Sequence, residues 1–154
     1  MKKTTLCFCI DGDKVLLGMK KRGFGAEKWN GFGGKVKNET PAAATIRELK
    51  EESALVAKVE DLSLVAKVEF SFAGEPFTEC WVYLLEVWQG EPAETKEMKP
   101  DWFDVADLPF QKMWAADAKW LPVVLSGKKI TAKVDFSTDG NEVNSFAWEE
   151  ALFD

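Results

Sequence analysis

The feature that most constrains the fold is a glycine-rich stretch that leads directly into an acidic helix. Residues 20–34 (KKRGFGAEKWNGFGG) hold five glycines in fifteen positions, which is typical of a loop or broken strand whose backbone lies close to another group. Thr40 and Pro41 then supply an N-cap and a first helical residue. The pattern predicts a loop followed by a helix that runs to Ser53.

The rest of the chain is typical of strands with one later helix. We expect strands at 4–10 and 14–19 joined by a tight turn, antiparallel strands at 55–72 and 77–88, a helix at 113–125 and a closing pair of strands at 129–136 and 142–150. Because strands and helices mix without regular βαβ alternation, an α+β fold is favoured over a doubly wound sheet. At this length we expect one domain over residues 1–154.

The absence of histidine restricts the chemistry. Of 154 residues none is His, which excludes Ser-His-Asp and Cys-His catalysis and His-ligated zinc. Acid and base work falls to carboxylates, lysines, Tyr83 or a metal-bound water. The net charge of −6 argues against a surface that coats nucleic acid, although it permits a phosphate ligand where a cation bridges acid to phosphate.

The cysteines and the N-terminus indicate a cellular compartment. Three cysteines, an odd number without metal-ligand spacing, favour a reduced chain in the cytoplasm. The first residues are too briefly apolar for a signal peptide, and no run approaches the ~18 apolar residues of a membrane span. We therefore expect a soluble cytoplasmic protein without a membrane partner.

Three glutamates lie on one face of the predicted helix. Glu48, Glu51 and Glu52 follow i, i+3, i+4 spacing, and like charges at that spacing repel one another by a few tenths of a kcal/mol per pair. Mg²⁺ would offset this repulsion, because it takes oxygen ligands from carboxylates together with substrate phosphates. Arg47 can pair with Glu51 and orient it, and Glu39 can reach the first turn of the helix. The alternative is an acidic face that is merely solvated.

These residues resemble the signature of the Nudix hydrolases, which is a glycine, a glutamate and then R-E-U-x-E-E-x-G-U, with U aliphatic. The matching positions are Gly33 or Gly34, Glu39, residues 47–53 (RELKEES) and Leu55. Counted from Gly34, the loop before Glu39 is one residue short, and Ala54 replaces the last glycine, which is tolerated unless that position needs a positive φ. The resemblance implies an α/β/α sandwich with a mixed central sheet and the signature helix.

A longer similarity, from about Thr4 to about Leu125, is to the MutT-related branch of this family that hydrolyses oxidised purine nucleoside triphosphates. It rests on the blocks LLGMKKRGFGAEKWNGFGGKV and EMKPDWFDVADLPFQKMW. It implies that water attacks a phosphorus of an 8-oxo-dGTP or 2-hydroxy-dATP type substrate and releases monophosphate and pyrophosphate, which cleans the nucleotide pool. Mg²⁺, with Mn²⁺ as the alternative, would bind to four glutamates, namely Glu48, Glu51, Glu52 and Glu97. The resemblance makes these four residues catalytic, together with Arg47.

The resemblance also implies a substrate pocket in which aromatic faces stack on a purine and an amide reads its edge. Its residues would be Thr5, Lys20, Phe24, Asn30, Gly33, Gly34, Phe70, Phe72, Met98, Trp114, Asp117 and Trp120. For any one of these aromatic residues, core packing is the competing interpretation, and Asn30 can equally be a turn residue. For Glu97 the alternative is an exposed acid, and for Lys20 a charged hairpin end.

One departure from the branch concerns substrate choice. The branch has W-P-D-D at its purine-recognising segment, whereas this chain has Trp114-Ala115-Ala116-Asp117. The loss of one carboxylate removes a hydrogen-bonding partner, so we expect a narrowed or altered purine preference, with Asp117 still reading the edge.

Two other functions stay open from the sequence. The chain can be a Nudix hydrolase of another nucleoside diphosphate derivative, or a catalytically silent nucleotide-binding module. Retention of all three helix glutamates favours the enzyme. We expect a monomer that takes a purine nucleoside triphosphate and has no stable nucleic-acid partner.

Overall fold

Strands of both directions form one mixed sheet in residues 1–153, the part of the chain that the computed structural model describes. The elements in chain order are β1 (Lys2–Asp11), β2 (Lys14–Lys20), β3 (Trp29–Asn30), α1 (Pro41–Ser53), β4 (Leu62–Phe72), β5 (Glu75–Leu85), β6 (Met98–Asp104), α2 (Asp117–Leu125), β7 (Ile130–Phe136) and β8 (Val143–Glu150). The strand order is β3-β2-β1-β5-β4-β7-β8, and β6 pairs with β2. Neighbours are antiparallel except β1–β5 and β4–β7, which are parallel.

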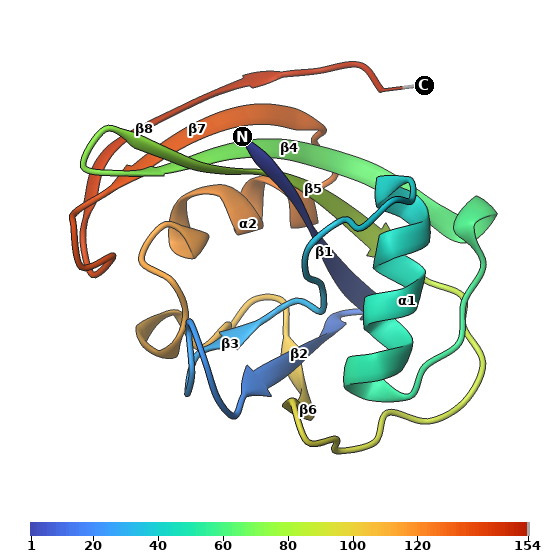
Figure 1. Cartoon of the computed structure of the whole chain (residues 1–154). Coiled ribbons are helices and arrows are strands. Elements are labelled where there is room, and N and C mark those ends of the chain that lie inside the picture. The colour runs from blue at the N-terminus through green and yellow to red at the C-terminus, as the bar shows by residue number, and fades with distance from the viewer. Residues whose placement is uncertain (154) are drawn as a thin grey trace.

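Strand β1 separates two apolar cores. Its alternate residues Cys7 and Cys9 are fully buried beside Leu49 of α1. Phe8 points to the other face, where its ring meets Trp120 of α2 edge-on at 6.1 Å between centroids. A strand that is apolar on both faces is buried on both sides, and α1 and α2 accordingly lie on opposite sides of β1 (Figure 1). The predicted α/β/α arrangement is confirmed.

The local signals before the first helix are also confirmed. Asp11 pairs with Lys14, so the first hairpin turns through two residues, and Gly12 has a φ of +59°. At the start of α1, the Thr40 hydroxyl accepts a hydrogen bond from the Ala43 N–H at 3.1 Å.

Several boundaries differ from the sequence prediction, among them the end of β5 at Leu85 rather than residue 88, and one strand was not predicted. Strand β4 begins at Leu62 rather than residue 55, because Leu55 is instead buried with Leu49 against the core beside α1. Helix α2 begins at Asp117 rather than residue 113. Strand β6 was not predicted, since it contains a proline and three charged residues, which suit a strand that pairs along β2 and is little buried.

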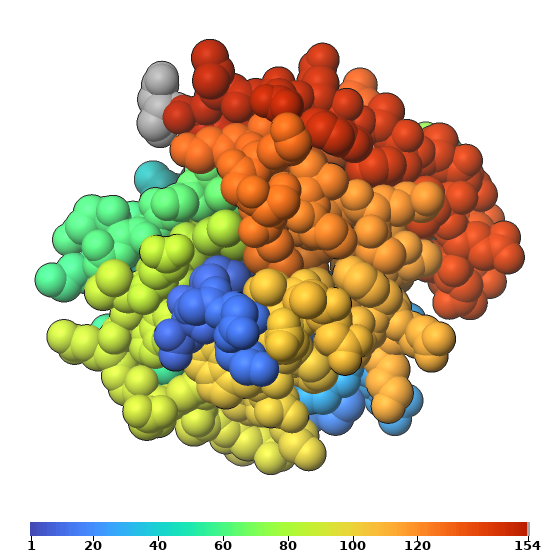
Figure 2. Space-filling model, turned by 180° about the vertical axis from the view of Figure 1, so that it is seen from behind, coloured from blue at the N-terminus to red at the C-terminus, as the bar shows by residue number. Residues whose placement is uncertain are grey.

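Within residues 1–153 no helix has the length and apolar character that crossing a bilayer requires. Figure 2, which views the molecule from behind, shows the C-terminal strands β7 and β8 (orange to red) gathered on one side. The segment from the end of β5 through β6 (yellow-green to yellow) covers the other side. In the strand order, β3 and β8 lie at opposite ends of the sheet, and β1, β5 and β4, which line the functional region described next, lie between them.

Ala54 ends α1 in a conformation that suits glycine. Its φ is +69° and its N–H donates to the Lys50 carbonyl at 2.9 Å. An L-residue in this left-handed region costs roughly 1–2 kcal/mol. The condition under which alanine is tolerated is therefore not met, and the chain carries local strain at this position.

We expect Ala54→Gly to stabilise the fold by about 0.5–1 kcal/mol, because relief of the left-handed strain exceeds the extra entropy of glycine in the unfolded chain. Urea unfolding measures the change. Ala42→Gly, inside α1, is the matched control and should instead cost about 1 kcal/mol. A loss of stability in Ala54→Gly would contradict the strain.

Candidate active site

Two consecutive glycines press the loop onto β1 and leave room for the helix glutamates. The Thr5 N–H donates to the Gly34 carbonyl at 2.9 Å. A Cβ atom at Gly33 would overlap the Thr5 carbonyl oxygen, and one at Gly34 would lie 2.7 Å from the Glu48 carboxylate. Gly33 thus permits the close approach of two backbones, and Gly34 makes space for a carboxylate.

The helix glutamates separate into two buried carboxylates and one exposed carboxylate. Glu52 is 9% exposed and accepts the Gly33 N–H at 2.8 Å. The Glu48 side chain is 14% exposed, whereas that of Glu51 is 57% exposed. Burial raises the pKa of Glu52 to about 8; the Gly33 N–H opposes this shift and the charge of Glu48 adds to it. Within residues 1–153, Glu52 is therefore a buried carboxylate without an ion-pair partner.

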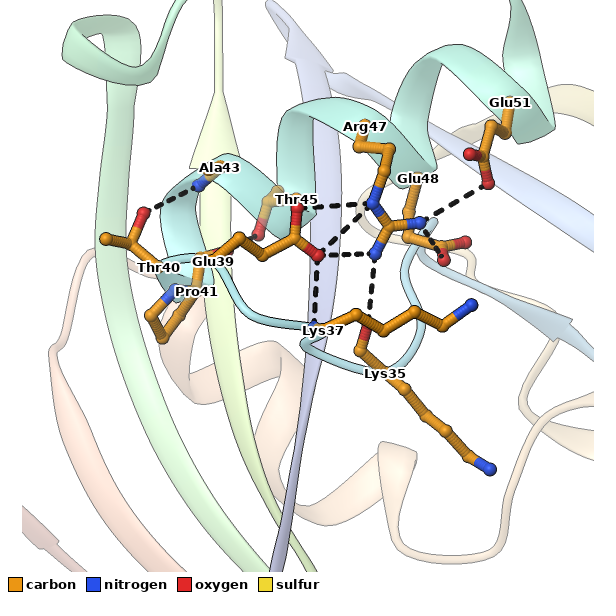
Figure 3. Close-up of polar contacts among 10 residues, drawn as sticks. All are labelled: Lys35, Lys37, Glu39, Thr40, Pro41, Ala43, Thr45, Arg47, Glu48 and Glu51. Atoms are coloured by element: carbon orange, nitrogen blue, oxygen red, sulfur yellow. Dashed lines mark hydrogen bonds and ion pairs between the residues drawn. The ribbon is translucent and has the colours of Figure 1, made fainter.

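Arg47 joins the loop to the helix (Figure 3). Its guanidinium donates to both Glu39 oxygens, at 2.6 and 3.2 Å, and to Glu48 Oε1 at 2.8 Å. It also donates to the Lys35 carbonyl at 3.1 Å. The predicted pair with Glu51 is long, at 3.5 Å, so Glu39 and Glu48 are the principal partners. The short loop still brings Glu39 to Arg47.

Glu97 lies at the edge of this cluster. Its charge contributes to the raised pKa of Glu52, which places it near the buried carboxylates. Its own carboxylate accepts a hydrogen bond from Arg22 at 2.6 Å, and this ion pair lowers the pKa of Glu97. Glu97 is therefore close to the site but paired with the loop that follows β2.

The cluster suits a divalent cation only when further oxygen ligands join it. Within residues 1–153, no three Asp, Glu, His or Cys side chains converge closely enough to hold a metal ion. Yet Glu48 and Glu52 are buried acids whose pKa values burial raises, and Gly34 leaves space beside Glu48. Hard cations such as Mg²⁺ are commonly held by one or two carboxylates with water and substrate phosphates, and the residues fit that arrangement.

A cavity of about 210 Å³ opens next to Glu52, between β1, the glycine loop and the segment before α2. Eleven of the twelve residues predicted for the substrate pocket line it. They are Thr5, Lys20, Phe24, Asn30, Gly33, Gly34, Phe70, Phe72, Met98, Trp114 and Asp117. Trp120 does not line the cavity. It is fully buried behind the cavity wall and packs on Phe8, which agrees with the alternative interpretation of core packing.

Several lining residues were missed from the sequence. Prominent among them are Thr4, Lys28, Phe77, Thr78, Cys80 and Phe136. The register of β4 and β5 gives the reason for two of these: Phe70 pairs with Thr78 and Ser71 with Pro76, which leaves Phe77 as an extra residue. Such a bulge allows consecutive side chains to reach the same cavity. A prediction that assumes strict alternation of side chains along a strand would place only one of the two residues there.

Aromatic rings form the mouth of the cavity. Phe24 is 59% exposed, and its ring lies 5.1 Å from that of Trp114 and 5.5 Å from that of Phe77, between centroids. The Lys20 ammonium donates to the Phe24 carbonyl at 2.6 Å and ties the loop tip to the end of β2. These flat faces suit a planar heterocycle, because ring stacking is favoured there.

Two polar side chains stand among these rings. Asn30 uses its side-chain oxygen to accept the Gly31 N–H at 2.8 Å, so it shapes the turn as well as lining the cavity. Asp117 is 3% exposed, and its Oδ2 has no hydrogen-bond partner within residues 1–153. Burial raises the pKa of Asp117 to about 7, which the Trp114 backbone opposes only in part. An unpartnered buried carboxyl in a cavity fits a ligand that supplies its partner.

We expect the stability advantage of Asp117→Asn over the wild type to be larger at pH 8 than at pH 5, by roughly 1–3 kcal/mol. From about pH 4 to 7 the folded protein keeps a proton on Asp117 that the unfolded chain releases, so wild-type stability falls as pH rises. The amide of the Asp117→Asn variant does not titrate, so the stability of this variant does not fall in the same way as pH rises. Urea unfolding at both pH values measures it, with exposed Asp107→Asn as control; an equal difference at both pH values would contradict the burial effect.

Comparison with known proteins gives consistent results. The NUDIX domain model matches residues 2–124. Oxidized purine nucleoside triphosphate hydrolase of Danio rerio is 45% identical over 137 residues, which cover 88% of this chain and 86% of that protein. The Mus musculus protein of the same name is 40% identical over 148 residues, covering 95% and 93%. A MutT protein from Bacillus halodurans has a similar fold, with a TM-score of 0.81 at 21% identity, covering 97% of this chain and 98% of that chain.

Proposed function

The chain belongs to the Nudix family of hydrolases, and on that premise we propose that it hydrolyses oxidised purine (deoxy)nucleoside triphosphates to monophosphate and pyrophosphate. The observation that carries the proposal is one continuous site: buried glutamates at one end and an aromatic cavity with an unpartnered carboxyl at the other. Glu52 lines the cavity itself, so a nucleotide whose base enters it has its phosphates near the glutamates.

At the phosphate end, we assign the metal to Glu48 and Glu52, with Glu51 and Glu97 at the periphery. Nudix hydrolases generally use divalent metal ions, and Mg²⁺ is the ion we propose, with Mn²⁺ as the alternative. When bound, the ion screens phosphate charge and lowers the pKa of a coordinated water. Arg47 orients Glu48 through its 2.8 Å hydrogen bond, and the Gly33 N–H fixes Glu52.

At the base end, the rings hold the purine and polar groups read its edge. Phe24, Phe72 and Trp114 offer flat faces, while Asn30 and Asp117 offer hydrogen-bonding groups. Lys20 lies beside Glu52, and its positive charge opposes the rise in the pKa of Glu52. We propose that Lys20 contacts a phosphate oxygen. We propose a monomer in the cytoplasm, a location that the three buried free thiols support.

We expect Glu52→Gln to lower kcat by at least about a hundredfold with the fold intact, since the amide keeps an acceptor for Gly33 but loses the charge that binds the metal. Pyrophosphate release with and without Mg²⁺ measures the loss, and circular dichroism checks the fold. Exposed Glu142→Gln is the matched control. Tight nucleotide binding by the wild type without turnover would favour the silent-module alternative instead.

The replacement of one aspartate by Ala116 gives a prediction on substrate choice. Ala116 is fully buried in the core beside α2, and Asp117 is the carboxyl that reaches the cavity. We expect unequal kcat/KM values, differing by about tenfold or more, across 8-oxo-dGTP, 2-hydroxy-dATP, O6-methyl-dGTP and the normal dNTPs, because one edge contact is worth about 1–3 kcal/mol.

Steady-state kinetics on that panel, for the wild type and Ala116→Asp, provides the measurement. The second carboxyl should reduce the differences between oxidised purines. Equal efficiency of the wild type on every purine and pyrimidine triphosphate would refute the proposed specificity. Preference for a dinucleotide or nucleotide sugar would favour the other Nudix activity.

A further inference from the structure

A pair of threonine hydroxyls lies in the wall of the cavity, and neither was expected from the sequence. Thr78 is 4% exposed and follows the bulge at Phe77, which turns both residues toward the cavity. Thr4 lies on the neighbouring strand β1, half-buried, and also lines the cavity. Their hydroxyl oxygens are 3.0 Å apart.

The contacts of the pair indicate the direction of its hydrogen bonds. Thr78 Oγ1 is 3.0 Å from the Lys2 carbonyl and 3.4 Å from the Glu79 carbonyl, and both can only accept, so we assign the Thr78 proton to them. With that assignment, Thr4 donates the hydrogen bond between the two hydroxyls. Both protons are committed to protein partners, and what remains toward the cavity is acceptor capacity on the two oxygens.

An acceptor-only patch selects among bases by their donors. The imidazole ring of an undamaged purine has an unprotonated N7, which is an acceptor and gains nothing beside another acceptor. Oxidation at C8 gives the 8-oxo base, whose diketo form carries an N–H at N7. The rest of the cavity wall near Thr78 is mostly apolar, including Phe70, Phe72 and Phe77, so a polar contact there is well shielded from water.

We propose that the Thr4–Thr78 hydroxyl pair is a specificity-determining contact that accepts a hydrogen bond from the N–H that oxidation creates on the purine. This inference rests on the proposed function and deepens it, because it names the contact that separates a purine oxidised at C8 from its undamaged form. Asp117 and Asn30 then read other atoms of the base.

The test compares binding of 8-oxo-dGMP and dGMP by calorimetry in the wild type, Thr78→Val and Thr78→Ser. Valine keeps the shape and removes the hydroxyl, whereas serine retains it. We expect the wild type to prefer 8-oxo-dGMP and Thr78→Val to lose about fivefold to tenfold of that preference, mainly through weaker 8-oxo-dGMP binding. Thr78→Ser should keep most of the preference.

Kinetics add a second measurement. With 8-oxo-dGTP, Thr78→Val should raise KM by a similar factor and leave kcat within about twofold, because the contact is remote from the glutamates. If Thr78→Val does not fold, Thr4→Val removes the other hydroxyl and should show the same loss. A preference that is unchanged in the valine variant, or equal losses for both monophosphates, would overturn the proposal.

The two proposals fail separately. If the wild type hydrolyses no oxidised purine triphosphate, the proposed function fails, while the ratio of the two monophosphate affinities still decides the role of the hydroxyl pair. If the wild type hydrolyses 8-oxo-dGTP but binds 8-oxo-dGMP and dGMP equally, the function stands and the hydroxyl contact is refuted.

Discussion

The guanidinium of Arg47 is the interaction on which the rest of the site depends. It links Glu39 in the loop, Glu48 in the helix and the Lys35 carbonyl, so it fixes the glycine loop relative to α1. Two carboxylates beside it would otherwise repel each other. Because the loop is held both by Arg47 and by backbone contacts to β1, the Gly33 N–H is positioned to donate to Glu52. One cation thus organises the acids while leaving Glu52 available to a second.

The phosphate end could be predicted from the sequence because its residues are close together along the chain. Helix spacing places Glu48 and Glu52 on one face, and the Thr40 cap marks where the helix begins. The sequence indicated only that alanine at position 54 would be unfavourable if its φ were positive. Local sequence alone does not fix that angle, which the structure shows to be left-handed. Of the acids, only Glu97 comes from a distant segment, and its pairing with Arg22 had no sequence signal.

The base end was harder to predict because distant segments build it. Strands β1, β4 and β5, the loop after β2 and the start of α2 each contribute one to three side chains. A bulge that inserts one residue changes which side chains reach the cavity, and Trp120 lies one layer too deep for direct contact. The proposed metal site and the proposed base pocket are therefore built from separate parts, so we expect the alanine at position 116 to alter selectivity without disturbing the glutamates.

The buried cysteines have a consequence for chemical durability. Cys7, Cys9 and Cys80 are all free and buried, and burial raises the pKa of Cys80 to about 12, while a hydrogen bond with Cys9 and burial raise that of Cys7. Peroxides attack the thiolate, and only where they can reach it. Under oxidative stress, when damaged nucleotides accumulate, the fully buried Cys7 and Cys9 are shielded from the oxidants that create the proposed substrates, and Cys80, which lines the cavity, is only 3% exposed.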